Sequence, residues 1–205
     1  MPDTTVNFWE IKEEIRVLGI DDGPFEFGEG QTALLVGTVF RGGLWLDGVL
    51  TTQIQVDGHD ATEKVAQMIA SSRHRGQLRV AMTDGLTFGG FNVLDAEEVL
   101  ARSGIPLISV TRTEPDLRSI RAALGKFPDA EARWARIERA GKPIRHAFHR
   151  PRGKGAVFFQ AFGIEEEDAH SIVEITSTRS LMPEPVRVAH MIASGVVKGE
   201  SYGRV

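Results

Sequence analysis

The chain has 205 residues, a formal net charge of −4, 41% hydrophobic residues and 25% charged residues. These values are ordinary for a single globular domain spanning residues 1–205, long enough to bury a substantial core. The sequence contains no cysteine, which excludes disulfides, thiolate zinc sites and cysteine nucleophiles. The first residues do not resemble a signal peptide and no apolar stretch has membrane-spanning length, so we expect a cytoplasmic protein.

The first half of the chain predicts four strands, because four short segments are rich in β-branched or bulky apolar residues and end at turn residues. These segments span residues 15–20, 32–40, 44–56 and 78–83. A short glycine turn separates the second from the third, which predicts an antiparallel hairpin continuing from the first strand. Before the fourth strand, Asp60 and Glu63 have capping-box spacing and predict a helix that ends near Gly76.

The second half predicts helices and two more strands. Asp95 is expected to cap a helix that stops at Gly104, and a strand at 105–110 completes a βαβ unit with parallel pairing. Further helices are expected at 116–124, 130–140, 165–177 and 182–193, with a last strand at 156–162. Three antiparallel strands, then helix, strand, helix and strand, is the element order of the ribonuclease H-like architecture. The predicted fold class is therefore a mixed α/β sheet flanked by helices.

Two strands end in an aspartate followed closely by a glycine, at Asp21 and at Asp84. If these strands are parallel neighbours, both carboxylates project from one edge of the sheet, where open α/β sheets place ligands. Two close anions repel unless a cation lies between them, so the pair predicts a magnesium or manganese site. Asp22 is the adjacent alternative on the opposite face, and Asp60 is a candidate third acid, with Asp57 as its substitute. Aspartate before glycine is also a common turn residue, so a structural interpretation of each stays open.

Cationic residues are concentrated in two places. Between residues 142 and 154 the chain carries no acidic residue and several basic ones, namely Lys142, Arg145, Arg150, Arg152 and Lys154. This run is typical of a solvated surface segment, and near a metal site it would also suit contacts with phosphates. Arg187 and His190 are three residues apart on the last predicted helix, so they share a face and could serve a phosphate and a water molecule.

Four segments carry a resemblance to a known family: IRVLGIDDGPF, VDGHDATE, VAMTDGLTFGGFNVLD and LMPEPVRVAH. They closely resemble the archaeal endonuclease dU family, which is in turn similar to endonuclease V. The first resemblance spans nearly the whole chain. The second is narrower and involves the two strand-end aspartates and the Pro-Glu-Pro-x-Arg-x-Ala-His string.

The resemblance implies a ribonuclease H-like fold and divalent-metal-dependent cleavage of a phosphodiester near a deaminated base, uracil or hypoxanthine, in DNA or possibly RNA. It implies metal-binding acids at Asp21, Asp84 and Asp60. His190 would join Asp21 and Asp84 as a catalytic residue. Arg112 stands roughly where endonuclease V has a lysine on the phosphate side. A role in DNA repair is the corresponding expectation.

The chain also departs from endonuclease V. The stretch after Asp84 lacks the histidine of that family, and the Pro-Tyr-Ile-Pro wedge has no counterpart. Phe88 or Phe91 could stack on a base instead, although packing in the core is the commoner role for such residues. A nucleic-acid-binding module without catalysis is therefore the alternative function. A nucleotide-handling protein is disfavoured, because no P-loop or dinucleotide fingerprint is present.

Overall fold

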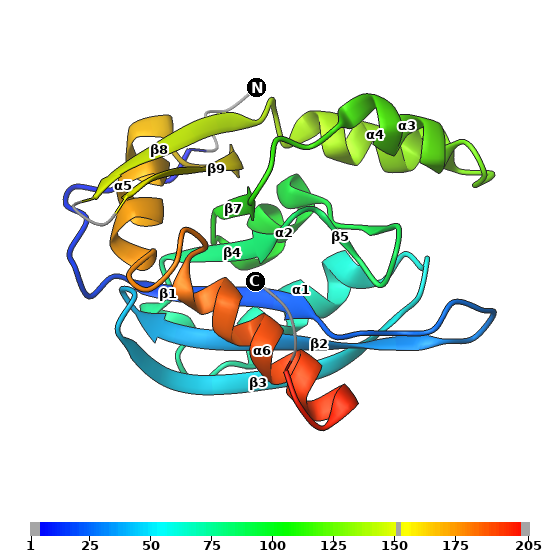
Figure 1. The fold of residues 1–205 in the computed structure, drawn as a ribbon, viewed down its shortest axis with the longest axis horizontal. Coiled ribbons are helices and arrows are strands. Elements are labelled where there is room, and N and C mark those ends of the chain that lie inside the picture. The colour runs from blue at the N-terminus through cyan, green and yellow to red at the C-terminus, as the bar shows by residue number, and fades with distance from the viewer. Residues whose placement is uncertain (1–4, 151–152, 202–205) are drawn as a thin grey trace.

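The computed structural model describes residues 5–150 and 153–201, and the side chains at 149, 150, 153 and 154 also lie outside the description. Seven strands form one mixed sheet in the order β3-β2-β1-β4-β7-β9-β8 (Figure 1). They are β1 Arg16–Asp22, β2 Thr32–Arg41, β3 Trp45–Gln55, β4 Val80–Asp84, β7 Leu107–Thr111, β8 Ile144–Arg150 and β9 Gly153–Phe162. Strand β1 lies inside the sheet, antiparallel to β2 and parallel to β4.

Helices cover both faces of the sheet. They are α1 Ala61–Ser71, α2 Ala96–Ser103, α3 Leu117–Leu124, α4 Ala130–Arg139, α5 Glu166–Thr176 and α6 Glu184–Lys198, with a short 3₁₀ turn η1 at Arg75–Gln77. Helices α1, α2 and α4 pack on one face and α5 and α6 on the other, and Figure 1 shows α6 crossing β1 and β2. No helix in residues 5–150 and 153–201 has the length and apolar character needed to cross a membrane.

Alternation along the strands divides the core in two. Leu18, Ile20 and Ala81 point toward α1 and α2, whereas Val17 and Met82 point toward α5 and α6. Successive strand side chains point to opposite faces, so each central strand contributes to both cores and is buried on both sides. The same alternation fixes the face to which the last residue of each strand projects.

The predicted fold class is confirmed, because the described chain has the mixed sheet of ribonuclease H-like proteins with helices on both faces. Three strands add to the prediction. Residues 87–93 form a small two-stranded hairpin, β5 Thr87–Phe88 and β6 Asn92–Val93, and most of the basic run forms the edge strand β8. The last helix also continues five residues beyond 193, to Lys198.

Asp95 caps α2 as predicted, because its Oδ1 accepts the backbone N–H of Glu98 and Gly104 ends the helix with a left-handed φ of 70°. The capping box predicted for Asp60 and Glu63 is wrong. The Asp60 side chain makes no cap hydrogen bond, and the N–H of Ala61 instead donates to the side-chain oxygen of Asn92. The first turn of α1 is thus bonded by Asn92, 31 residues from Ala61, and not by the side chain of Asp60.

Candidate metal centre at the edge of the sheet

The carboxyl ends of β1 and β4 bring Asp21 and Asp84 together. The parallel register pairs Ile20 with Thr83, which places the next residue of each strand side by side at one edge. Asp21 is four residues beyond Val17 and Asp84 is two beyond Met82, and both reference residues face α5 and α6. Both carboxylates therefore project on the same face, under the N-terminal half of α6.

Helix α6 approaches the sheet closely at its first turn. Gly19 has no side chain where Pro185 packs, and a Cβ built at Gly19 would lie 2.2 Å from the Pro185 carbonyl carbon. The hydroxyl of Thr38 donates to the Pro185 carbonyl oxygen over 2.6 Å. One and a half turns further along the helix, Nδ1 of His190 lies 2.8 Å from Oδ2 of Asp21. The conformation of the Pro-Glu-Pro string thus places His190 at the carboxylate.

Burial gives these acids unusual protonation behaviour. Burial raises the pKa of Asp21 to about 7, although the hydrogen bond with His190 lowers it, and the charges of Asp84 and Asp22 raise it further. Burial also raises the pKa of Asp84, against the charges of His190 and Arg112. The pKa of His190 is raised chiefly by its hydrogen bond with Asp21. Asp21 and His190 therefore compete for a proton near neutral pH.

Asp22 lies on the opposite face of β1 and faces the segment 85–92. Its Oδ2 accepts the backbone N–H of Gly89 over 2.9 Å. Burial raises its pKa to about 6, and the negative charge of Asp84 adds to the increase. Three carboxylates thus share one electrostatic environment, in which His190 and Arg112 are the basic groups that lower their pKa values.

The acids fit a hard divalent cation. Among the described residues the carboxylate of Asp84 makes no hydrogen bond or ion pair, so a partly buried anion is left for a ligand. No three acidic or histidine side chains in the described ranges form a complete metal cage. Magnesium typically takes one or two carboxylates and completes its octahedron with water and substrate phosphate. Two protein ligands, Asp21 and Asp84, would therefore be enough. The two aspartates would hold such an ion through oxygen ligands.

Asp60 does not join this pair. Its Oδ1 accepts the backbone N–H of Gln55 and the side-chain amide of Asn92, at 3.1 and 2.6 Å. These bonds fix the start of α1 to the end of β3 and to β6, so the structure supports a structural role for Asp60. Asp57, its proposed substitute, accepts the backbone N–H of Phe91 over 2.8 Å and so also has a structural role in this loop.

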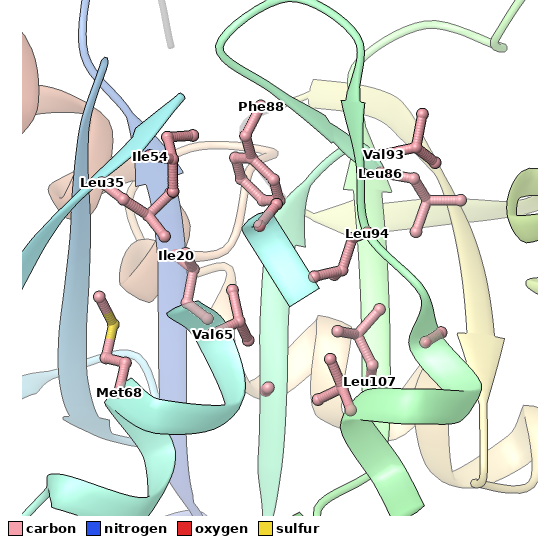
Figure 2. Packing of buried hydrophobic residues seen from close by; sticks show 14 of the residues in the cluster. Ile20, Leu35, Ile54, Val65, Met68, Leu86, Phe88, Val93, Leu94 and Leu107 are labelled. Carbon is pink, nitrogen blue, oxygen red and sulfur yellow. The ribbon is translucent and has the colours of Figure 1, made fainter. Parts of the chain in front are cut away.

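The two phenylalanines proposed for base stacking have different environments. Phe88 is fully buried between α1 and the sheet, where Figure 2 shows it beside Ile54 and Leu94, so its stacking role is wrong. Phe91 is partly buried. Its ring packs edge-to-face on Phe127 with centroids 5.7 Å apart, and Lys126 Nζ lies 5.2 Å from its centroid. A nucleic-acid contact by Phe91 stays a prediction.

Arg187 is engaged within the protein, which argues against the proposed phosphate contact. Its guanidinium makes three hydrogen bonds to the carboxylate of Glu184, the shortest 2.7 Å. Glu184 is buried and also accepts the backbone N–H of Arg179. A buried carboxylate without a partner would be costly, so the guanidinium is needed to neutralise the start of α6.

The other proposed cations lie on the surface of the same sheet edge. Arg112 follows β7 directly, is exposed, and is close enough to Asp84 to lower its pKa. Lys142 and Arg145 are exposed, and the register aligns Thr111 of β7 with Phe158 and then with Arg145 of β8. The β8–β9 hairpin thus extends beyond the carboxyl end of β7. Arg150 ends β8, and its side chain lies outside the described part.

Two features of the site had weaker sequence signals. Gly19 was not singled out, although a glycine inside an apolar strand indicates a close approach by another element. Asp22 was assigned only to the opposite face, and the sequence does not reveal that this face meets Gly89.

The mixed sheet and its flanking helices place the chain in a class of proteins, those with the ribonuclease H-like fold. Endonuclease V from Ciona intestinalis, crystallised with a DNA containing an inosine followed by a ribo-adenosine, superposes with a TM-score of 0.58 at 16% identity, covering 90% of this chain and 86% of that one. Argonaute from Marinitoga piezophila, in complex with guide RNA and target DNA, has a TM-score of 0.58 at 10% identity, covering 90% of this chain and 30% of its own. These similarities show the fold.

Within that class, the chain belongs to the endonuclease dU family, whose model matches residues 13–197. A UPF0215 protein of Methanothermobacter thermautotrophicus is 56% identical over 96% of this chain and 95% of its own length. A protein of unknown function from Archaeoglobus fulgidus has a solved structure with a TM-score of 0.76 and 34% identity, covering 88% of this chain and 97% of that one.

Proposed function

We propose that the protein is a divalent-metal-dependent endonuclease that cuts nucleic acid near a deaminated base. The observation that carries the proposal is the pair Asp21 and Asp84, two carboxylates adjacent on parallel strands and on the same face. Buried carboxylates so close together are costly in the ion-free protein, which the raised pKa values of both express. A divalent cation would remove that cost.

Asp21 and Asp84 would hold the ion, Mg²⁺ or Mn²⁺. When bound, it would supply a water of lowered pKa and positive charge beside the phosphate. Cleavage adds water across one P–O bond, and a nearby group must accept or deliver a proton. His190 suits this role, because its Nδ1 is bound to Asp21 while Nε2 has no partner among the described side chains.

The exposed cations would hold the phosphate backbone. Arg112 is placed beside Asp84, and Lys142 and Arg145 lie further along the same sheet edge. Such contacts orient a strand without choosing its sequence. Arg150, at the end of β8, is proposed for the same role from its place in the sequence.

The substrate is proposed to be DNA bearing uracil or hypoxanthine, which makes the activity a step in DNA repair; RNA is the second possibility. Membership of the endonuclease dU family supports the assignment. The inosine-containing DNA crystallised with Ciona endonuclease V supports hypoxanthine. A deaminated base carries a carbonyl where its parent has an amine, so its recognition requires hydrogen-bond donors facing an extruded base.

The test uses labelled oligonucleotides that carry uracil, hypoxanthine or no modified base, with Mn²⁺, Mg²⁺ or EDTA. We expect metal-dependent cutting of a modified strand. Asp21→Asn and Asp84→Asn should each lower the rate at least about a hundredfold, while circular dichroism shows a folded protein. Glu63→Gln, on the exposed face of α1, is the matched control.

Two outcomes would contradict the proposal. Undiminished cutting by both aspartate variants would remove the metal site from the mechanism. Salt-dependent binding without any product, equal in wild type and variants, would establish instead a binding module without catalysis.

A further inference from the structure

The segment 85–92 begins directly after Asp84 and is held from two sides. On one side, Asp22 Oδ2 accepts the N–H of Gly89 over 2.9 Å. On the other, Asp57 Oδ1 accepts the N–H of Phe91 over 2.8 Å. This segment is called the glycine loop below, because Gly89 and Gly90 have φ values of +50° and +86°, which other residues rarely adopt.

The Asp57 side is anchored to the rest of the protein by a buried arginine. Arg133 of α4 donates to the carbonyl oxygens of Phe91, Gly58 and Asp57 and pairs with Asp129. The backbone of Asp57 also donates to the Gly89 carbonyl oxygen over 2.7 Å. This half of the glycine loop therefore has several independent attachments to α1 and α4.

On the side of β1, the glycine loop is attached through Asp22. The bond to Gly89 is the only hydrogen bond that the described residues form with the Asp22 carboxylate oxygens. The side chain of the neighbouring residue, Asp21, faces α6 instead and bonds to His190. Two consecutive residues of β1 thus have different roles. Asp21 carries a carboxylate of the candidate metal site, and Asp22 holds the glycine loop.

We propose that Asp22 is a positioning residue that ties the glycine loop to the metal-binding edge of the sheet. The inference rests on the proposed function and deepens it. Whatever part of the substrate contacts the glycine loop is held at a fixed distance from Asp21 and Asp84. Backbone groups of the glycine loop are proposed to recognise the extruded base, so the bond through Gly89 would keep the selection of a deaminated base in register with the cleaved phosphodiester.

The design of the variants separates a hydrogen bond from a charge. Asp22→Ala removes the acceptor for Gly89. Asp22→Asn keeps an oxygen in the same place, so it should still accept that N–H while carrying no charge. Asp57→Gly is the matched control, because glycine tolerates the φ of +54° at this position and removes the acceptor for Phe91 on the other side of the loop.

Two measurements are made on each variant. The rate of hydrogen exchange at the Gly89 amide measures its hydrogen bond with Asp22, whether or not the protein is catalytically active. The ratio of kcat/KM for a uracil- or hypoxanthine-containing strand to that for an unmodified strand, with Mn²⁺, reports discrimination. We expect Asp22→Ala to speed exchange at Gly89 and to lower the ratio about 10- to 100-fold, as loss of outer-shell partners commonly does. Asp22→Asn should retain both, and Asp57→Gly should lower the ratio less.

Three results would overturn the inference. They are wild-type discrimination in Asp22→Ala, loss of discrimination in Asp22→Asn with Gly89 still protected, and an equal loss in Asp57→Gly. If the wild type cuts no strand, the proposed function fails, and the exchange at Gly89 still decides whether Asp22 holds the loop.

Discussion

At the scale of single residues, the candidate site concentrates negative charge where water is scarce. Asp21 is buried, and Asp22 and Asp84 are partly buried beside it. All three carboxyl groups have raised pKa values, chiefly because burial penalises the charged form. A cluster of buried carboxyl groups with raised pKa values is characteristic of a functional site, and here it would suit a cation.

The raised pKa values predict how stability depends on pH. Between about pH 4, where free aspartate titrates, and about pH 7, the folded protein holds protons that the unfolded chain has released. Stability therefore falls as pH rises through this window, and the raised pKa of His190 acts in the same direction. Thermal unfolding in EDTA should show a lower melting temperature at pH 8 than at pH 5.

Two comparisons control this prediction. Asp21→Asn should flatten the profile, and Mg²⁺ should flatten it by favouring the charged carboxylates. Asp116 and Asp129 have lowered pKa values, so their contribution is lost only below the window. A melting temperature in EDTA that rises from pH 5 to pH 8 would contradict the assignment.

The placement of residues was predictable from sequence where it depends on strand alternation and register. Asp21 and Asp84 meet because two short apolar runs end alike and pair in parallel. Phe88 was assigned wrongly, and the pairing of Arg187 with Glu184 was not foreseen, because these partners depend on the tertiary structure. A phenylalanine beside glycines can face the core or the solvent, and a buried Glu184 beside Arg187 is not visible in the sequence.

At the scale of elements, the contact between β1 and α6 sets the geometry of the site. Gly19→Ala would place a methyl group against the Pro185 backbone, so α6 must move away from the sheet. We expect a loss of about 3 kcal/mol in the free energy of unfolding, at the upper end for overpacking. Cleavage should fall with it, because His190 is carried on the displaced helix.

Gly76→Ala is the matched control for that substitution. A Cβ at Gly76 meets nothing within 4 Å, so the free energy of unfolding should change by less than about 1 kcal/mol. Denaturant unfolding of both variants measures the difference. Equal stability of Gly19→Ala and Gly76→Ala would show that α6 does not depend on this contact.

The elements missing from the prediction are those with weak local signals. Strand β8 is a basic run whose pairing with β9 creates its regular structure, and β5 and β6 are two residues each. Short strands of this kind depend on tertiary contacts more than on the pattern of their own residues. The longer apolar strands and the helix with a cap at Asp95 were predicted correctly.

At the scale of the whole molecule, the net charge of −4 gives no attraction to nucleic acid, so binding must come from local cations at the sheet edge. Arg112→Gln and Arg145→Gln should each weaken binding of every strand, modified or not. Each should also reduce the slope of log K against log salt concentration by about 1. Fluorescence anisotropy with labelled oligonucleotides checks both quantities, with exposed Arg73→Gln, outside this edge, as the control. An unchanged slope would place the phosphate contacts elsewhere.

The most direct measurement of the metal centre is anomalous diffraction from a crystal grown with Mn²⁺. We expect one strong peak between the carboxylates of Asp21 and Asp84, on the face covered by α6, and no peak there in crystals of Asp84→Asn. A peak confined to other residues, with these two carboxylates free of metal, would contradict the central claim.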